Sequence, residues 1–150
     1  MLVVRPVAES DTDAVLEITR WFAATFVVDE AEFLRSIAEV LADSSACFLL
    51  AELDRAVIGY VLGYQHPTLH ANGPVLWIDE LAVVEAHQRS GVGRALMNAI
   101  EDWACERGCV MVNLATRRAA GFYKAMGYEA SAAYFRKLLY PGSGAAKSCV

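Results

Sequence analysis

The stretch Gln88-Arg89-Ser90-Gly91-Val92-Gly93-Arg94 decides the fold. It follows an apolar, strand-like run over residues 75–84 and opens an amphipathic helix whose apolar residues recur at helical spacing. Its two glycines allow a sharp turn and a close approach of the backbone to a ligand. Because the first N–H groups of a helix have no partner inside it, the turn predicts an anion site suited to a diphosphate, to which Arg89 and Arg94 add charge.

Three interpretations of this turn compete. A P-loop requires a Gly-Lys pair, and the chain contains none. A dinucleotide-binding fingerprint requires a third glycine where this chain has Leu96. An ordinary glycine-rich helix start explains the two glycines, but it does not explain the flanking arginines and Gln88.

Outward from the turn, the hydrophobic pattern predicts a single α/β domain. Strands are expected at residues 2–7, 47–53, 57–64, 75–84, 110–114 and 132–139, and helices after residues 11 and 29, from 92 to Gly108 and over 117–126. The predicted order is therefore β-α-α-β-β-β-α-β-α-β. We expect residues 1–140 to form this domain and residues 141–150 to form a flexible tail.

Composition excludes several classes of function. Hydrophobic residues make up 56% of the 150 residues, which is enough for a core. The net charge of −5 argues against nucleic-acid binding, although local arginines can still hold an anionic ligand. Four cysteines without a CxxC pair suggest no metal site. No signal peptide or membrane-length apolar run occurs, so we expect a cytoplasmic protein without a membrane partner.

The segment Gln88–Gly93 matches the Q/R-x-x-G-x-G/A motif of the GNAT superfamily of N-acetyltransferases. The chain resembles that family in two further places. Leu81-Ala82-Val83 ends the preceding strand, and Phe122-Tyr123 is followed by Gly127-Tyr128. The resemblance covers residues 2 to 139 and includes the order of elements. It implies a GNAT-like domain with a mixed, mainly antiparallel central sheet flanked by about four helices.

The resemblance also implies acetyl-CoA as a cosubstrate. The glycine loop would bind its diphosphate, and the strand ending at Val83 would pair with the pantetheine arm through its backbone. Thr116 stands where many members carry Asn, seven residues before Tyr123, and its hydroxyl is expected to bond the same arm. The implied cofactor-binding residues are Leu81, Ala82, Val83, Gln88, Arg89, Ser90, Gly91, Val92, Gly93, Arg94 and Thr116.

Acetylation of an amine requires a base and an acid. An alkylammonium has a pKa of about 10.4, so it must lose a proton before attack, and the leaving thiolate must be protonated or stabilised. Glu80, at the cofactor edge, is the expected base, and a solvated strand residue is the alternative. Asp79 points to the opposite face of a regular strand and replaces Glu80 if a bulge shifts the register. The resemblance makes Tyr123 the acid; a core tyrosine is the alternative.

We therefore expect an N-acetyltransferase that moves an acetyl group from acetyl-CoA to a primary amine directly, in a ternary complex. The acceptor is a small-molecule or peptide amine: aminoglycosides, polyamines, amino acids and protein N-termini all stay open. Its walls are expected from Trp21–Glu30, from the loop His66–Pro74 and from the segment after Tyr128. The acidic residues expected at its mouth are Asp29, Glu30, Glu32 and Glu80.

The alternative function is a non-catalytic acyl-CoA-binding or regulatory module on the same fold. A homodimer is compatible with the sequence. His66 and His70 stand four residues apart, but Pro67 and the loop context argue against a helical metal site. Arg117, Arg118 and Lys124 form a basic cluster that is either a solvated helix face or a contact for the adenosine end of the cofactor.

Overall fold

Five strands and four α-helices make up the described part of the chain, residues 1–23 and 25–139, in a computed structural model. The elements are β1 (Leu2–Pro6), η1 (Glu9–Asp11), α1 (Thr12–Phe22), α2 (Glu30–Ala42), β2 (Ala46–Leu53), β3 (Ala56–His66), β4 (Val75–Val83), η2 (Glu85–His87), α3 (Val92–Glu106), β5 (Met111–Leu114) and α4 (Ala120–Ala125). The tail expected over residues 141–150 lies outside the described residues.

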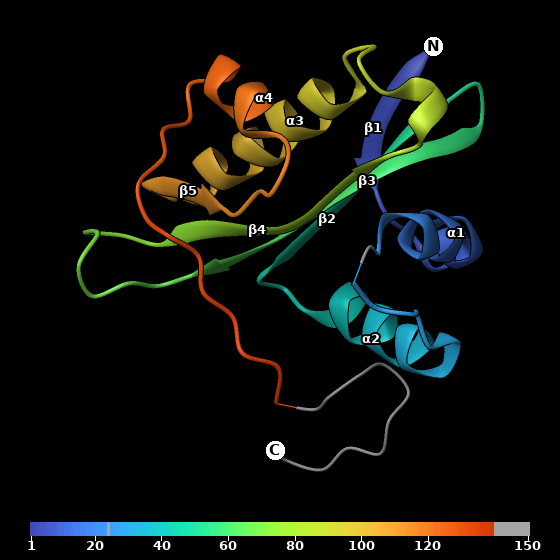
Figure 1. Cartoon of the computed structure of the whole chain (residues 1–150), viewed down its shortest axis with the longest axis horizontal. Coiled ribbons are helices and arrows are strands. Elements are labelled where there is room, and N and C mark those ends of the chain that lie inside the picture. The colour runs from blue at the N-terminus through green and yellow to red at the C-terminus, as the bar shows by residue number, and fades with distance from the viewer. Residues whose placement is uncertain (24, 140–150) are drawn as a thin grey trace.

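The strands form one sheet in the order β1-β2-β3-β4-β5. Neighbours pair antiparallel from β1 to β4, and β5 pairs parallel to β4. Helices α1 and α2 cover one face of the sheet, and α3 and α4 cover the other (Figure 1). The predicted fold class, a single α/β domain with a mixed and mainly antiparallel sheet, is therefore confirmed. No helix of the described residues combines the length and the apolar character that a membrane span needs.

Local signals in the sequence explain where the elements begin and end. The Asp29 carboxylate accepts a hydrogen bond from the Glu32 backbone N–H at 3.0 Å, so α2 begins at the predicted cap. Asp54 and Arg55 both take positive φ and form the tight turn between β2 and β3. Gly108, with a φ of 74°, follows the end of α3 as predicted.

A β-bulge at Asp79 divides β4 into two halves that face differently. Leu62 of β3 pairs with Glu80, whereas the next residue, Gly63, pairs with Ile78, so Asp79 is the extra residue. One extra residue reverses the alternation of all side chains beyond it. Ile78 accordingly packs in the core beneath α3, whereas Glu80 faces the α1 side of the sheet.

Two predicted elements differ from the structure. The strand expected over residues 132–139 is wrong: no strand forms there, and Tyr134 and Phe135 are exposed. Apolar alternation describes a segment that can pair, but it does not supply a partner strand. The helix expected over residues 117–126 begins only at Ala120, because the Thr116 hydroxyl accepts the Ala119 N–H and holds a turn before α4.

Candidate active site

The site is built where β4 and β5 separate. β5 pairs with β4 only over Val75–Ile78, before the bulge. Beyond it, Leu81, Ala82 and Val83 pair with β3 on one side, and no strand of the described chain pairs with their other edge. That edge offers unpaired backbone groups to an extended ligand. Its three residues are those expected to pair with the pantetheine arm.

Glu80 lies at the start of this open edge. Its carboxylate is half-buried on the α1 side and accepts a hydrogen bond from the Tyr60 hydroxyl at 2.8 Å. Burial raises the pKa of Glu80 above its usual value, the Tyr60 hydrogen bond opposes that shift, and the charge of Asp79 adds to it. A carboxylate with a raised pKa is a better proton acceptor near neutral pH.

Asp79 occupies the bulge and is exposed. Desolvation raises the pKa of its carboxyl, so both neighbouring acids have higher affinity for a proton than ordinary side chains. The sequence made Asp79 the candidate base if a bulge shifted the register, and a bulge is present. The carboxylate that faces α1 and Tyr60 is nevertheless that of Glu80.

The loop before α3 presents a run of unpaired backbone N–H groups. Gly91 adopts a φ of 88° as the N-cap of α3, and Arg89 also has a positive φ, of 58°. No acceptor within residues 1–23 and 25–139 receives the backbone N–H of residues 89 to 94. A Cβ added at Gly91 would meet no atom within 4 Å, so the space in front of the turn is open. The loop is therefore a cradle that fits an anion.

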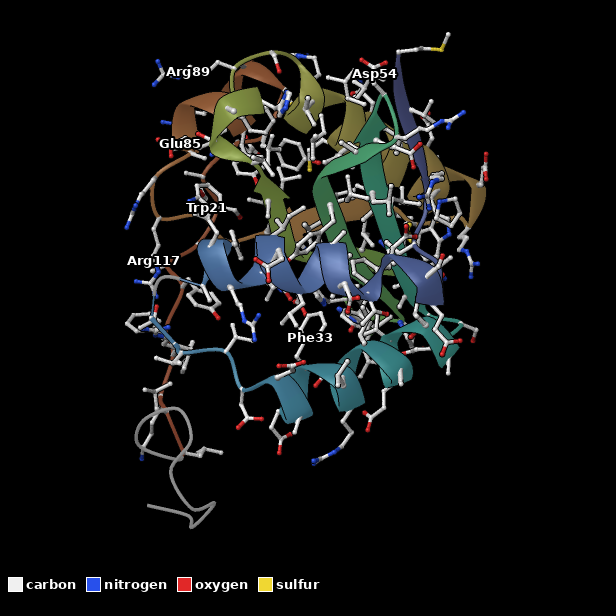
Figure 2. The ribbon with its side chains drawn as sticks, turned by 90° about the vertical axis from the view of Figure 1, so that its right-hand side faces the viewer. Trp21, Phe33, Asp54, Glu85, Arg89 and Arg117 are labelled. Atoms are coloured by element: carbon white, nitrogen blue, oxygen red, sulfur yellow. The ribbon has the colours of Figure 1, made fainter. Side chains whose placement is uncertain are left out.

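The charges around this cradle are uncommitted. Arg89 and Arg94 are exposed, and neither forms an ion pair with any described residue. Figure 2 shows Arg89 pointing outward from the loop, on the same side of the molecule as Glu85 and Arg117. Both guanidinium groups are therefore free to pair with a phosphate.

Three residues expected in the cofactor site instead hold the loops in place. The Gln88 side-chain amide donates to the Val83 carbonyl at 3.1 Å, which ties the loop to the end of β4. The Ser90 hydroxyl donates to the His87 carbonyl. The Thr116 hydroxyl is the acceptor that forms the turn before α4. These three side chains therefore hold the loops that border the site in place. Their contact with the cofactor stays a prediction.

Tyr123 lies on α4, in the core cluster beneath α3, and is 9% exposed. Its ring meets Phe122 and Tyr128 edge to face, at centroid distances of 5.0 and 5.7 Å. Its hydroxyl makes no hydrogen bond to the described residues. Every fully buried side-chain oxygen or nitrogen among those residues has a hydrogen-bond partner. The hydroxyl therefore reaches accessible space, and burial of the ring raises its pKa.

Three of the four acids expected at the mouth are engaged by other parts of the chain. Glu30 pairs with Arg20, Glu32 pairs with Arg35, and Asp29 caps α2. The acids that remain at the site are Asp79 and Glu80.

Exposed aromatic side chains accompany these acids at the end of α1. Trp21 is 51% exposed, and Phe22 and Phe26 are also exposed. In Figure 2, Trp21 points away from α2, whereas Phe33 lies between α1 and α2. Trp21, Phe22 and Phe26 therefore add apolar surface near the acids of this region.

The described thiols and His66 lie away from the cradle, whereas His87 directly precedes it at the end of η2. Cys47 is buried in the core, which raises its pKa to about 12. Cys105 and Cys109 lie at the end of α3 that is remote from the cradle. The His66 ring hydrogen-bonds the neighbouring Pro67 carbonyl, and residues 1–23 and 25–139 contain no cluster suited to a metal ion.

Sequence reasoning missed Tyr60 and Thr19. Tyr60 stands in an apolar run and Thr19 stands inside a helix, so neither belongs to a motif. The available signal was the alternation of β3, which places Tyr60 on the face that Glu80 joins only because of the bulge.

Comparisons with known proteins show the family and the fold. The profile of the acetyltransferase (GNAT) family matches residues 15–128. The chain is similar to the N-alpha-acetyltransferase of Sulfurisphaera tokodaii, with 28% identity over 140 residues, which cover 84% of this chain and 79% of the relative. It is also similar to the aminoglycoside N(6')-acetyltransferase type 1 of Stenotrophomonas maltophilia, with 29% identity over 125 residues, which cover 77% of this chain and 82% of the relative.

Among solved structures, the fold is similar to that of the aminoglycoside N-acetyltransferase AAC(6')-Iy in complex with CoA. The TM-score is 0.80 at 17% identity, and the match covers 91% of this chain and 95% of that one. At this identity the likeness concerns the fold alone. Because the family profile spans most of the described chain, including the open edge of β4, the cradle and Tyr123, the protein belongs to the GNAT acetyltransferase family and is an N-acetyltransferase of that type.

Proposed function

We propose that this enzyme transfers an acetyl group from acetyl-CoA to a primary amine directly, in a ternary complex, with Glu80 as base and Tyr123 as acid. The observation that carries the proposal is the bulge at Asp79, which brings a half-buried carboxylate to the beginning of the open β4 edge. That carboxylate lies beside the edge where an extended ligand can pair. It is suited to receive a proton from an ammonium group held beside the edge.

The cradle and the open edge fit acetyl-CoA. The unpaired N–H groups of residues 89 to 94, with Arg89 and Arg94, supply donors and charge for a diphosphate. The unpaired backbone of Leu81–Val83 supplies donors and acceptors for the amides of a pantetheine arm. When bound, acetyl-CoA supplies an activated thioester carbonyl.

Glu80 acts on the amine. An ammonium beside the Asp79 and Glu80 carboxylates is attracted by their charge, and Glu80 then takes its proton. Because burial raises the pKa of Glu80, the difference from the ammonium is smaller than for an exposed carboxylate. The neutral nitrogen can then attack the thioester carbonyl.

Tyr123 acts on the sulfur. Its hydroxyl is uncommitted and donates a proton to the sulfur as the C–S bond breaks. The raised pKa of Tyr123 makes it a weaker acid than a free thiol, so proton transfer must accompany bond cleavage rather than precede it. The nitrogen gives up two protons in all, one to Glu80 before attack and one to solvent as the tetrahedral adduct collapses to the amide. The sulfur gains the proton of Tyr123, and solvent then reprotonates the tyrosine and removes the proton from Glu80, so one proton is released overall.

The positions of Cys105 and Cys47 support direct transfer. Val92 to Cys105 on α3 spans 14 residues, a rise of about 20 Å, so Cys105 is remote from the cradle. Cys47 is buried with a pKa of about 12 and is protonated at neutral pH. Neither thiol is placed to carry the acetyl group as a covalent intermediate.

The acceptor we propose is a cationic small-molecule or peptide amine. Its charge would meet Asp79 and Glu80, and the exposed ring of Trp21 would contact its apolar part. An aminoglycoside and a protein N-terminus both satisfy this description, and both stand among the substrates named for similar proteins.

The test is release of free thiol from acetyl-CoA against a panel of aminoglycosides, polyamines, amino acids and peptides. Wild type should release thiol with at least one amine, and Glu80→Gln should lose most of that turnover. Mass spectrometry of the enzyme incubated with acetyl-CoA alone should find no acetylated residue. Binding of acetyl-CoA by calorimetry without turnover on any amine would favour the non-catalytic module instead.

A further inference from the structure

Glu80, Tyr60 and Thr19 form a chain of hydrogen bonds across three elements. The Tyr60 hydroxyl donates to Oε1 of Glu80 at 2.8 Å. The Thr19 Oγ1 lies 3.1 Å from the Tyr60 oxygen, and either atom can be the donor. The Thr19 hydroxyl also donates to the Val15 carbonyl, one turn earlier in α1, at 2.8 Å. The chain therefore begins at a titratable carboxyl and ends at a backbone carbonyl.

We infer that Tyr60 and Thr19 are positioning residues that hold Glu80 in both of its protonation states, because the Tyr60 hydroxyl can turn its hydrogen from Glu80 to Thr19. The inference rests on the proposed role of Glu80 as base. It adds to that role the way in which a buried carboxyl can accept a proton and stay in place.

The count of hydroxyl hydrogens supports this turn of the Tyr60 hydroxyl. With Glu80 ionised, Tyr60 donates to the carboxylate and Thr19 donates to Val15. With Glu80 protonated on Oε1, its new O–H donates to Tyr60, Tyr60 donates to Thr19, and Thr19 still donates to Val15. Each donor has an acceptor in both states. Only the Tyr60 hydroxyl rotates, and the proton taken from the amine stays on Glu80.

Burial makes it important that the Tyr60 hydroxyl keeps an acceptor in both states. Tyr60 is 1% exposed and its ring meets Phe48 edge to face, so its hydroxyl has no water to turn to when its partner changes. A buried hydroxyl without an acceptor is costly, and a buried carboxylate without a donor is more so. Val15 serves as a fixed end because a carbonyl only accepts.

Other groups near Glu80 affect its pKa but do not belong to this chain of hydrogen bonds. On β4, Asp79 adds a like charge that favours the protonated form. On β3, Tyr64 interacts electrostatically with both carboxylates. On α1, the neighbouring Arg20 pairs with Glu17 and Glu30 instead of Glu80.

The two hydroxyls have opposite predicted effects on the titration of Glu80. Tyr60→Phe removes the donor to the carboxylate, so the pKa of Glu80 should rise. Thr19→Val removes the acceptor that Tyr60 needs when Glu80 is protonated, so the pKa of Glu80 should fall. We expect each shift to be on the order of one pH unit.

The experiment measures the Glu80 carboxyl directly, by a carbon-detected NMR titration of the full chain without substrates, with Glu80→Gln assigning the signal. Thr19→Ser, which keeps the hydroxyl, should titrate as wild type. Thr12→Val is the matched control, because the Thr12 hydroxyl also donates to a backbone carbonyl of the preceding turn, that of Glu9, but does not contact Tyr60. It should leave the titration unchanged.

The acidic limb of the pH–rate profile should move as the NMR titration does, to higher pH in Tyr60→Phe and to lower pH in Thr19→Val. Shifts of the same sign in Tyr60→Phe and Thr19→Val, or no shift in Thr19→Val, would overturn the inference. Should Tyr60→Phe fail to fold, the Thr19→Val and Thr19→Ser pair decides alone, since only a downward shift in Thr19→Val supports the turn of the Tyr60 hydroxyl. If Glu80→Gln retains full activity, the proposed base is wrong, and the NMR shifts still decide on the chain.

Discussion

Glu80 and Tyr123 lie on opposite faces of the sheet. The carboxylate faces α1 together with Tyr60, and the phenol packs beneath α3 in the cluster that Val83 borders. The proposed base and the proposed acid are therefore separated by the sheet and share no hydrogen bond. Each can serve a different reactant across the opening between β4 and β5, the amine from one face and the sulfur from the other.

Tyr123→Phe should lower kcat by about 10²–10⁴-fold, because it removes a positioned proton donor. The affinity for acetyl-CoA by calorimetry should stay near wild type, since the ring keeps its edge contacts with Phe122 and Tyr128. Tyr128→Phe is the control: it removes a hydroxyl bound to Glu101 from the same aromatic cluster and should keep kcat. Near-full activity of Tyr123→Phe with a good acceptor would return Tyr123 to a core role.

Glu80→Gln should reduce kcat/KM most near neutral pH. In wild type the rate should rise with pH as Glu80 ionises, and that limb should lie above the ordinary Glu value because burial raises the pKa of Glu80. The loss in Glu80→Gln should shrink at high pH, where more of the amine is already neutral.

Asp79→Asn is the control for Glu80→Gln. It removes the charge that raises the pKa of Glu80, so it should shift the acidic limb downward without abolishing turnover. If instead Asp79→Asn is inactive and Glu80→Gln is not, Asp79 is the base.

Gly91→Ala should weaken acetyl-CoA binding. Its φ of 88° is unfavourable for a residue with a side chain and costs about 1–2 kcal/mol, and relief of that strain would move the N–H groups that follow. Gly108→Ala is the matched control, because it also has a positive φ and open space but lies at the other end of α3. Both variants should lose similar thermal stability, and only Gly91→Ala should lose affinity. Equal affinities would remove the cradle from the cofactor site.

Asp11→Asn should destabilise the fold by about 2 kcal/mol at neutral pH. Asp11 is buried, accepts two hydrogen bonds from Arg5 at 2.8 and 2.9 Å and one from the Ala8 N–H, and these hold its pKa below the ordinary value. A lowered carboxyl pKa stabilises the fold above the unfolded value near 3.9 and stops doing so as pH falls through the lower folded value. Denaturation between pH 7 and 2 should therefore show a steeper acid loss in wild type than in Asp11→Asn. The exposed variant Asp13→Asn should follow wild type.

Much of the fold followed from local patterns in the sequence. The cap at Asp29, the turn at Asp54-Arg55 and the glycine loop each depend on neighbouring residues, so their positions were predictable. The strand expected over residues 132–139 failed because pairing depends on a partner from elsewhere in the sheet, which alternation cannot supply.

The site itself was predictable only in part. The adjacent carboxylates Asp79 and Glu80 interrupt an apolar strand in the sequence and so marked the position of the site. The choice between them depended on a register shift that only tertiary pairing reveals. That same shift made Tyr60 the partner of Glu80, and Thr19 contacts Tyr60 in turn. Contacts that join three elements leave no periodic trace in the chain.

The bulge at Asp79 also bears on how the chain reaches its native state. Were β4 to pair with β3 without the extra residue, Glu80 would follow Leu76 and Ile78 into the apolar core beneath α3. An unpartnered carboxylate there costs several kcal/mol, so the misaligned hairpin is a poor competitor during folding. The side chain that we assign to proton transfer therefore also disfavours the misaligned pairing of β3 and β4. Glu80→Gln or Glu80→Leu should fold with a larger share of slow, misaligned molecules.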